Sequence, residues 1–325
     1  MGILINILII TPIKHIDGLY EKISGLGSVT YLPDPTLDEV LEFVDGVDVI
    51  FTNPNKSKVF LGSDVFNRGK DIKVVCTAST GTVHIDKELA NNRNIKIISI
   101  TKELETINKI SSTAELAFTL MMTSIRNVTP AIDSVRNGDW DYERFIGRQV
   151  NQLNIGVIGY GRLGKMFVHY CRSFGAKVKV YDPYKSINEE GVQQVHELSE
   201  VFLESNVIAL HVHVTPETHG MISKDALCFA NSDITIINTS RGEVVNEEDI
   251  VEFLANNPKS RYATDVLASE FNSKQENPII KFSKSDAGFY QTIIVPHIGG
   301  MTSDAQMLAY HRAADMLDSY LEEMV

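Results

Sequence analysis

The stretch Asn154-Ile-Gly-Val-Ile-Gly-Tyr-Gly-Arg-Leu-Gly164 leads through an amphipathic run into a second apolar stretch, Lys177-Val-Lys-Val-Tyr-Asp182. The apolar residues before Gly159 are typical of a buried strand, and the residues after Gly164 have helical periodicity. The second apolar stretch predicts another strand, which ends at an acid. Strand, glycine-rich turn, helix and strand in this order predict a dinucleotide-binding βαβ unit.

The glycines of this turn have separate predicted roles. Gly159 permits the tight turn, Gly161 lets the backbone approach a pyrophosphate at the helix N-terminus, and Gly164 lets the helix pack closely on the strand. Asp182 can accept hydrogen bonds from both ribose hydroxyls, and its charge would repel a 2′-phosphate. We therefore expect NAD rather than NADP; the alternative is a purely structural glycine turn.

Length and composition restrict the class of protein. A chain of 325 residues is too long for one ordinary core and suggests two domains. Its 43% apolar and 22% charged residues are typical of a soluble globular protein, and a net charge of −12 argues against nucleic acid or an anionic membrane as partner. Cys76, Cys171 and Cys228 have no metal-ligand spacing, so we expect no metal site and a reducing, cytoplasmic location. The apolar run Ile3–Ile10 is too short to span a bilayer and predicts a buried first strand.

The first hundred residues alternate between short apolar runs and helical patterns. Thr36-Leu-Asp-Glu39 is a capping box that predicts a short helix ending near Gly46. Alternation of this kind predicts a parallel sheet covered on both faces. The expected strands are Leu4–Ile10, Val29–Leu32, Val47–Thr52, Val74–Thr77 and Ile95–Ile100.

A long helical stripe runs from Glu103 to Val128, and we expect Pro130 to stop it. A helix of this length often bridges two domains. Residues 130–150 include a charged stretch with little periodicity and the only tryptophan, Trp140. Two readings stay open for it: a dimerisation arm that packs on a second subunit, or a surface excursion.

The second half of the chain again alternates strands with helices. Expected strands are Ile155–Gly159, Val178–Tyr181, Val207–His211, Ile234–Asn238, Tyr262–Val266 and Ile293–Val295. A capping box, Ser303-Asp-Ala-Gln306, predicts the start of the last helix, which has no further sheet to join and is expected to return to the first domain. We therefore predict a discontinuous domain of residues 1–102 plus 301–325, a nucleotide-binding domain of residues 103–300, and a cleft between them.

Three ionisable residues each follow a predicted strand of the nucleotide-binding half. In open α/β sheets ligands bind beyond the carboxyl ends of the strands, where Arg241, Glu270 and His297 are expected. Arg241 can bind a carboxylate and polarise the neighbouring carbonyl, His297 can donate a proton to the developing alkoxide, and Glu270 can stabilise the imidazolium. Each residue alone has an ordinary structural explanation. Together, above a nucleotide site, they favour reduction of an anionic 2-oxo acid.

With these residues the chain resembles the D-isomer-specific 2-hydroxyacid dehydrogenases. The resemblance covers essentially its whole length. The motifs that carry the resemblance are Ala78-Ser-Thr-Gly-Thr-Val-His-Ile-Asp86, Thr113-Ala-Glu-Leu-Ala117, the glycine turn, His213-Val-Thr-Pro-Glu-Thr218, Asn238-Thr-Ser-Arg-Gly242, Asp265-Val with Glu270, and Pro296-His-Ile-Gly-Gly300.

The resemblance implies an α/β architecture of two doubly wound parallel-sheet domains, a Rossmann NAD-binding domain and a flavodoxin-like substrate domain. It assigns the catalytic roles to Arg241, Glu270 and His297, and implies that Asp265 binds the nicotinamide carboxamide. Backbone N–H groups of Thr80 and Gly81 would bind the substrate carboxylate, with Asn53 and Lys56 near the tail of the substrate. Further cofactor contacts are implied at Tyr160, Arg162, Leu163, Thr215, Pro216, Thr239, Gly299 and Gly300, whereas His84, His211 and His213 are expected to be framework or core residues.

We therefore expect an NAD-dependent oxidoreductase that transfers a hydride between nicotinamide and C2 of a D-2-hydroxy or 2-oxo acid, and that forms a homodimer. The phosphoglycerate dehydrogenases are the nearest members in overall character, without the C-terminal regulatory domain that many of them carry. Lys56 and Lys58 either meet a phosphate or second carboxylate on the substrate or are solvated loop residues. The alternatives are a hydroxypyruvate or glyoxylate reductase, phosphite oxidation, and a non-enzymatic NAD-sensing protein. A formate dehydrogenase is disfavoured, since those members carry Gln where Glu270 stands.

Overall fold

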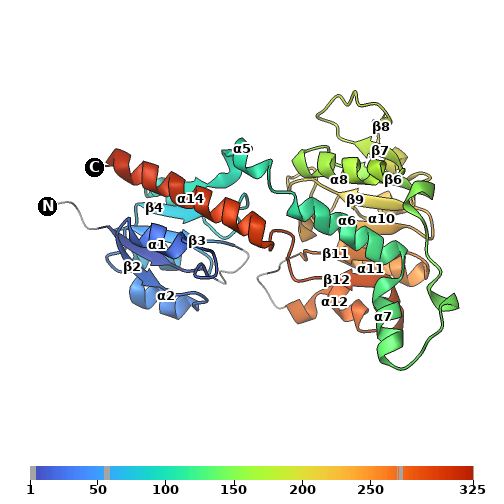
Figure 1. Ribbon diagram of the computed structural model, residues 1–325, viewed down its shortest axis with the longest axis horizontal. Helices are drawn as coiled ribbons and strands as arrows, with labels where there is room; N and C mark the ends of the chain where they lie inside the picture. Colours follow the sequence, from blue (N-terminus) through green and yellow to red (C-terminus); the bar gives the residue numbers. More distant parts are fainter. Residues whose placement is uncertain (1–4, 55–58, 269, 271–273, 325) are drawn as a thin grey trace. The chain divides into compact units, whose positions relative to one another are not determined.

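The computed structural model describes residues 5–54, 59–268, 270 and 274–324. The chain forms two compact units (Figure 1): unit 1 is Met1–Ile110 with Met301–Val325, and unit 2 is Ser111–Gly300. Each unit is built on one parallel sheet, of five and seven strands respectively, which confirms the predicted α/β class with two parallel sheets.

The sheet of unit 1 has the strand order β2-β1-β3-β4-β5, which is the flavodoxin-like order. Its strands are mostly apolar runs because helices cover both faces. They are β1 (Asn6–Ile9), β2 (Ser28–Tyr31), β3 (Val49–Thr52), β4 (Val74–Thr77) and β5 (Lys96–Ser99). Each falls within or overlaps one of the five predicted strands.

Helices cover both faces of this sheet. On one face lie α1 (Leu19–Ser24), α5 (Leu104–Ile107) and α14 (Ser303–Met324), whose buried residues form one cluster with the sheet. On the other face lie α2 (Leu37–Phe43), α3 (Ser63–Arg68) and α4 (Lys87–Asn92). Figure 1 shows α14, in red, lying along unit 1 beside α1, so the end of the chain completes the core of its beginning.

Two predicted helix starts have different outcomes. The capping box at Thr36 and Glu39 forms as predicted and opens α2. The capping box predicted at Ser303 is wrong by one residue, because the hydroxyl of Thr302 accepts from the Ala305 N–H. The Gln306 side chain, which would have closed the predicted box, instead bonds to His15.

The sheet of unit 2 has the order β12-β11-β10-β9-β6-β7-β8, in which β6 to β11 follow the Rossmann order and β12 extends one edge. Its strands are β6 (Asn154–Ile158), β7 (Lys177–Tyr181), β8 (Val192–Val195), β9 (Val207–Leu210), β10 (Thr235–Asn238), β11 (Arg261–Thr264) and β12 (Thr292–Ile294). The sequence predicted six of these and missed β8. This edge strand has Gln193 and Gln194 at its centre and lacks the apolar run used to find the others.

Two further buried clusters cover the faces of the second sheet. One involves α6 (Ser112–Ile125) and α8 (Arg162–Ser173). The other involves α9 (Leu198–Phe202), α10 (Lys224–Leu227), α11 (Glu247–Asn256) and α12 (Pro278–Ser283). The remaining elements of the chain are α7 (Val128–Arg136), α13 (Asp286–Gln291), and the short 3₁₀ helices η1 (Ile100–Lys102), η2 (Glu143–Phe145), η3 (Val150–Gln152), η4 (Gly242–Val244) and η5 (Lys274–Glu276).

The single helix predicted from Glu103 to Val128 is broken into α5 and α6. Ile107 packs into the core of unit 1 and Ala117 into the core of unit 2, so the two halves of the apolar stripe serve different cores. Residues 103–110 accordingly belong to unit 1, whereas we expected the boundary at residue 102. Pro130 lies in the first turn of α7 rather than after a helix end, because a first-turn N–H has no intrahelical acceptor to lose.

Among the residues the structure describes, no helix is both long enough and apolar enough to cross a membrane.

Candidate active site

The glycine-rich turn between β6 and α8 has the geometry that a dinucleotide requires. Gly159 has a positive φ of 93°, and a Cβ there would lie 2.5 Å from the carbonyl oxygen of His211. A Cβ on Gly164 would lie 2.1 Å from the Gly159 carbonyl oxygen, so the helix packs directly on the turn. A Cβ on Gly161 would meet no described protein atom within 4 Å. Packing therefore explains two of the glycines. It does not explain the third, whose contact with a pyrophosphate stays a prediction.

Asp182 closes the same site at the end of β7. It is buried, and its carboxylate accepts from the N–H of Tyr160 (2.8 Å) and of Tyr184 (3.0 Å). The carboxylate is therefore fixed against the glycine turn, and each oxygen keeps a lone pair for a further donor. The predicted contact with a ribose stays a prediction.

Two residues that the sequence did not single out also hold this turn. Lys185 donates to the carbonyl of Tyr160 (2.6 Å) and lies 3.9 Å from Asp182. Glu189 accepts from the Tyr160 hydroxyl and pairs with Arg172 on α8 (2.7 Å). Burial and the hydrogen bond to Glu189 raise the pKa of Tyr160 to about 12. The only sequence signal for them was their position shortly after Asp182.

Arg241 follows β10 and is positioned by a turn built on Asn238. The Asn238 side chain accepts from the N–H and hydroxyl of Ser240 and donates to the carbonyl of Arg241 (2.9 Å). The guanidinium of Arg241 donates to the Ser240 carbonyl (2.7 Å) and is half-buried. Its positive charge contributes to lowering the pKa of Glu270.

Glu270 and His297 form a hydrogen-bonded pair. His297 Nδ1 lies 2.7 Å from Glu270 Oε2, and Glu270 Oε1 accepts from the Leu267 N–H at 2.9 Å. Burial raises the pKa of Glu270, but the hydrogen bond and charge of His297 outweigh it and lower that pKa overall. The pairing through Nδ1 leaves Nε2 as the ring nitrogen able to exchange a proton with a substrate.

Asp265 fixes the backbone that carries His297. Its two carboxylate oxygens accept from the N–H groups of Ile298 (2.6 Å) and Gly299 (2.8 Å), and burial raises its pKa. His297 itself has a left-handed φ of 53°. The nicotinamide contact expected of Asp265 thus stays a prediction, and the structure shows a backbone role beside it.

The other predicted cofactor residues lie on loops that follow strands of unit 2. Thr239 is buried directly after β10, and its hydroxyl has no partner among the described residues, which suits a polar ligand at this edge. Thr215 and Pro216 form an exposed turn after β9, and Gly300 is half-buried beyond β12. Arg162 and Leu163 begin α8 and are half-buried.

The histidines expected to be framework residues differ in burial. His84 is buried, and its two ring nitrogens have no hydrogen-bond partner among the described residues. His211 packs against Phe167 with 5.1 Å between ring centroids. His213 is exposed, so it is not a core residue.

The predicted substrate residues lie in unit 1, at the carboxyl ends of the neighbouring strands β3 and β4. Asn53 follows β3, is buried, and donates to the Ala78 carbonyl (3.2 Å), which ties the two loops together. Thr80 is exposed and Gly81 half-buried, and no backbone acceptor is found for either N–H within the described ranges. Lys56 and Lys58 lie outside the described residues.

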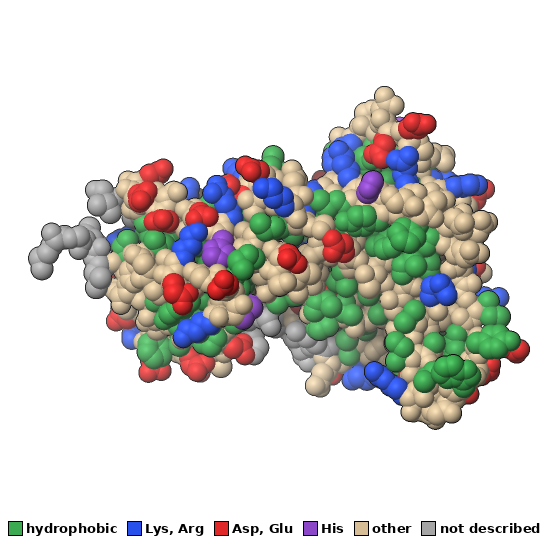
Figure 2. All heavy atoms as spheres, viewed as in Figure 1, with side chains coloured by type: hydrophobic (Ala, Val, Ile, Leu, Met, Phe, Trp, Pro, Cys, Tyr) green, Lys and Arg blue, Asp and Glu red, His purple; other side chains and the backbone are tan. Residues whose placement is uncertain are grey.

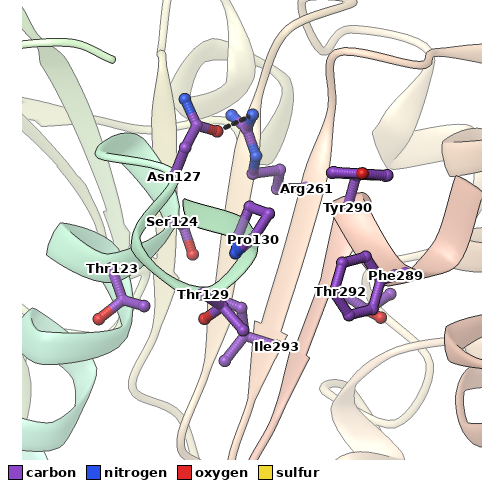
Figure 3. A pocket seen from close by; sticks show the side chains of 10 residues that line it. All are labelled: Thr123, Ser124, Asn127, Thr129, Pro130, Arg261, Phe289, Tyr290, Thr292 and Ile293. Carbon is purple, nitrogen blue, oxygen red and sulfur yellow. Dashed lines mark hydrogen bonds between the residues drawn. The ribbon is translucent and has the colours of Figure 1, made fainter. Parts of the chain in front are cut away.

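A small pocket in unit 2 lies apart from these residues, between α6, α7, β11, β12 and α13 (Figure 3). Figure 3 shows Arg261 donating to Asn127 at its rim, with Pro130 and Tyr290 beside them. None of the predicted site residues lines it. In the part of the chain that the structure covers, no group of three or more His, Cys, Asp or Glu residues is arranged to hold a metal.

The sequence is similar to those of several known proteins. The family model described as "D-isomer specific 2-hydroxyacid dehydrogenase, NAD binding domain" matches residues 118–299. D-3-phosphoglycerate dehydrogenase of Methanocaldococcus jannaschii is 29% identical over 321 residues, which are 98% of this chain and 58% of that relative. Hydroxypyruvate reductase of Thermotoga maritima is 28% identical over 269 residues, 83% of each chain.

The chain thus spans little more than half the length of the first of these relatives. Among solved structures, D-lactate dehydrogenase from Aquifex aeolicus, complexed with NAD and lactic acid, superposes with a TM-score of 0.81. The two are 22% identical, and the match covers 98% of this chain and 97% of that one, which shows a shared fold.

Proposed function

Because the chain belongs to the D-isomer-specific 2-hydroxyacid dehydrogenase family, we propose that it interconverts a D-2-hydroxy acid and the corresponding 2-oxo acid with NAD as the hydride carrier. The observation that carries the proposal is the Glu270–His297 pair, 2.7 Å apart, with Arg241 close enough to affect the pKa of Glu270. These groups follow strands of the sheet that also bears the glycine-rich turn.

The proposed chemistry assigns one role to each side chain. The nicotinamide cofactor supplies or accepts the hydride at substrate C2. Arg241 binds the substrate carboxylate and polarises the carbonyl oxygen. His297 Nε2 donates a proton to the developing alkoxide during reduction and takes the hydroxyl proton during oxidation. Glu270 stabilises the imidazolium through Nδ1.

The environment of Asp182 supports NAD as the cofactor. Its carboxylate is held beside the glycine turn, where a 2′-phosphate would bring two negative charges together. Lys185 lies 3.9 Å from Asp182 and offsets part of this repulsion. We propose a preference for NAD because Lys185 also donates to the Tyr160 carbonyl and is therefore committed to the turn.

For the substrate we propose a small 2-hydroxy acid, with 3-phosphoglycerate as the first candidate and hydroxypyruvate or glyoxylate as the alternatives. The carboxylate would bind the N–H groups of Thr80 and Gly81, which lack backbone acceptors in the described part of unit 1. The relatives named above support these candidates without choosing among them, since both are less than 30% identical to this chain.

We also propose a homodimer built on α7 and the segment that follows it. Six large apolar side chains are exposed there, with Trp140 87% and Tyr142 79% exposed; the others are Val128, Ile132, Val135 and Ile146. Figure 2 shows hydrophobic side chains gathered over this part of unit 2. The three cysteines are free, which supports a cytoplasmic location.

NADH oxidation by the purified protein, followed by absorbance, tests the proposed reaction. The 2-oxo acids offered are 3-phosphohydroxypyruvate, hydroxypyruvate, glyoxylate, pyruvate and 2-oxoglutarate, each with NADH and with NADPH. We expect turnover with at least one of them and a higher kcat/KM with NADH. His297→Ala should lower kcat by roughly 10²- to 10⁴-fold with NADH binding nearly unchanged.

His196→Ala is the matched control, because His196 is exposed and follows β8, at the opposite edge of the sheet from β12. Near-full activity in His297→Ala would refute the role of that residue. NADH binding without turnover on any substrate would instead favour a sensor, and a higher kcat/KM with NADPH would refute the cofactor preference.

A further inference from the structure

Glu247 is a buried carboxylate near the catalytic residues that the proposed reaction does not use. It is the first residue of α11 and is only 7% exposed, although a glutamate at this position normally reaches into solvent. The neighbouring Asn246 already caps the helix by accepting from the N–H groups of Glu248 and Asp249. The Glu247 side chain is therefore not needed as a cap.

The two oxygens of Glu247 bind the two ends of the segment that carries Glu270. Oε1 accepts from the Ala268 N–H at 2.9 Å, and Oε2 accepts from the Asn277 side-chain amide at 2.5 Å. The Asn277 side-chain oxygen accepts from the N–H groups of Ile279 and Ile280 at the start of α12. A rotation that exchanged its oxygen and nitrogen would break both of these hydrogen bonds. One buried carboxylate thus clamps residues 268 and 277, with Glu270 between them.

Leu267, whose carbonyl belongs to the peptide bond held by Glu247, contacts both Glu270 and the residue next to Arg241. The N–H of Leu267, one residue before Ala268, donates to Glu270 Oε1. On its other side this peptide packs on Gly242, next to Arg241: a Cβ on Gly242 would lie 1.9 Å from the Leu267 carbonyl carbon. The Leu267–Ala268 peptide is therefore held between the Arg241 turn and Glu247, and a displacement of it moves Glu270 relative to His297.

Burial of this acid has an energetic cost that the two bonds offset only in part. Burial raises the pKa of Glu247, the bonds from Ala268 and Asn277 lower it, and the charges of Glu243 and Glu270 raise it further. An apolar side chain could fill the space without this cost, but it could not accept from both ends of the segment.

We propose that Glu247 is a positioning residue that sets the place of Glu270 against His297 by holding Ala268 and Asn277 together. This inference rests on the proposed function, because it assigns Glu247 a role through the catalytic pair. Glu247 itself touches neither substrate nor cofactor in this scheme.

A charge-swap cycle tests the clamp. Glu247→Gln keeps an acceptor for Ala268 but turns an amide N–H₂ toward the amide of Asn277. Asn277→Asp places a second carboxylate against Glu247 and still caps α12. In the double variant the new amide at position 247 can donate to the new carboxylate at position 277, so the clamp is rebuilt with the charge moved.

We expect each single variant to lower kcat by roughly 10- to 100-fold, since small misplacements of catalytic groups have effects of this size. KM for NADH should stay within about twofold. The pH profile of kcat should shift, because a weakened contact with His297 lowers the pKa of Glu270 less. The double variant should recover at least about tenfold over Glu247→Gln. Glu248→Gln removes the same charge from the exposed neighbouring position and should leave kcat and the pH profile unchanged.

Hydrogen exchange gives a readout that does not depend on turnover. The Ala268 amide should exchange at least about tenfold faster in Glu247→Gln than in the wild type and should be protected again in the double variant. Unchanged exchange and unchanged kcat in Glu247→Gln would overturn the proposal, as would a double variant no better than the single ones. An inactive wild-type protein in which the exchange pattern still holds would refute the proposed reaction and leave the clamp intact.

Discussion

His297 combines an uncommon backbone conformation with a specific hydrogen bond. Its left-handed φ of 53° costs roughly 1–2 kcal/mol for a residue with a Cβ. The backbone is held there by Asp265, whose carboxylate accepts from the next two N–H groups. The Nδ1 bond to Glu270 then orients the ring. Two separate acids thus position one imidazole, one through its backbone and one through its side chain.

His84 is a buried histidine whose protonation should affect the stability of the fold. It is 1% exposed, its ring nitrogens lack partners within the described ranges, and burial lowers its pKa to about 4. Between pH 6.5 and 4, His84 is therefore protonated in the unfolded chain but neutral in the folded chain. The free energy of unfolding therefore falls as the pH falls through this window. The full effect is about 3 kcal/mol. We expect Tm, measured by calorimetry, to fall less in His84→Leu than in the wild type between about pH 7.5 and 4.5.

The control for His84 is His196→Leu, in which an exposed histidine is replaced by the same residue. It should keep the pH dependence of the wild type. The same fall in Tm with pH in His84→Leu and wild type would contradict the prediction. His211, whose pKa burial also lowers to about 4, is present in every variant and contributes equally.

In the β6–α8 turn, one glycine is required by packing and another is expected to serve ligand binding. Gly164→Ala would force a Cβ to 2.1 Å from a backbone oxygen, whereas Gly161→Ala meets no described atom within 4 Å. We expect Gly164→Ala to lower Tm by roughly 5 °C or more. Gly161→Ala should change Tm by only a few degrees and weaken NADH binding at least about tenfold, since its new methyl group would face the pyrophosphate.

Calorimetry and fluorescence titration with NADH measure the two effects on the same samples. The interpretation of the turn fails if Gly161→Ala binds NADH as tightly as the wild type. It also fails if both variants lose the same stability, because Gly161 would then be a packing residue.

Elements also differ in how far the sequence predicted them. Eleven of the twelve strands overlap predicted ones, because an apolar run between turn residues is a local pattern. The edge strand β8 was missed because its centre is polar. The break between α5 and α6 was missed because an unbroken apolar stripe does not reveal that its halves enter different cores.

For the whole molecule, the exposed apolar residues of α7 and the following segment lead to a prediction about assembly. Monomeric proteins rarely expose so many large apolar side chains in one place. We expect the wild-type protein to sediment as a dimer and the double variant Ile132→Glu with Val135→Glu to sediment as a monomer at the same concentration. Analytical ultracentrifugation measures this directly.

Leu203→Glu supplies the control, because Leu203 is similarly exposed but lies after α9, away from α7. It should leave the dimer intact. A monomeric wild-type protein would show that the segment is a surface excursion, which was the alternative left open by the sequence.

Local patterns in the amino-acid sequence were sufficient to predict most strands and the candidate site residues of this protein. The glycine turn, the acid at Asp182 and the candidate residues Arg241, Glu270 and His297 were all predicted from strand ends and spacing. This is possible because hydrophobic periodicity and backbone requirements are properties of neighbouring residues. The order of strands in each sheet is not such a property, and it came with the family resemblance rather than from periodicity.

The contacts that make these residues a site arise only when distant segments meet. Glu270 reaches His297 across 27 positions because β11 and β12 are paired in the sheet. Glu247 reaches Ala268 across 21 positions and Asn277 across 30, and no periodicity in the sequence indicates either bond. The sequence around Glu247 would place this acid in solvent, but the fold buries it. A buried carboxylate needs hydrogen-bond donors, and here other elements of the fold supply them.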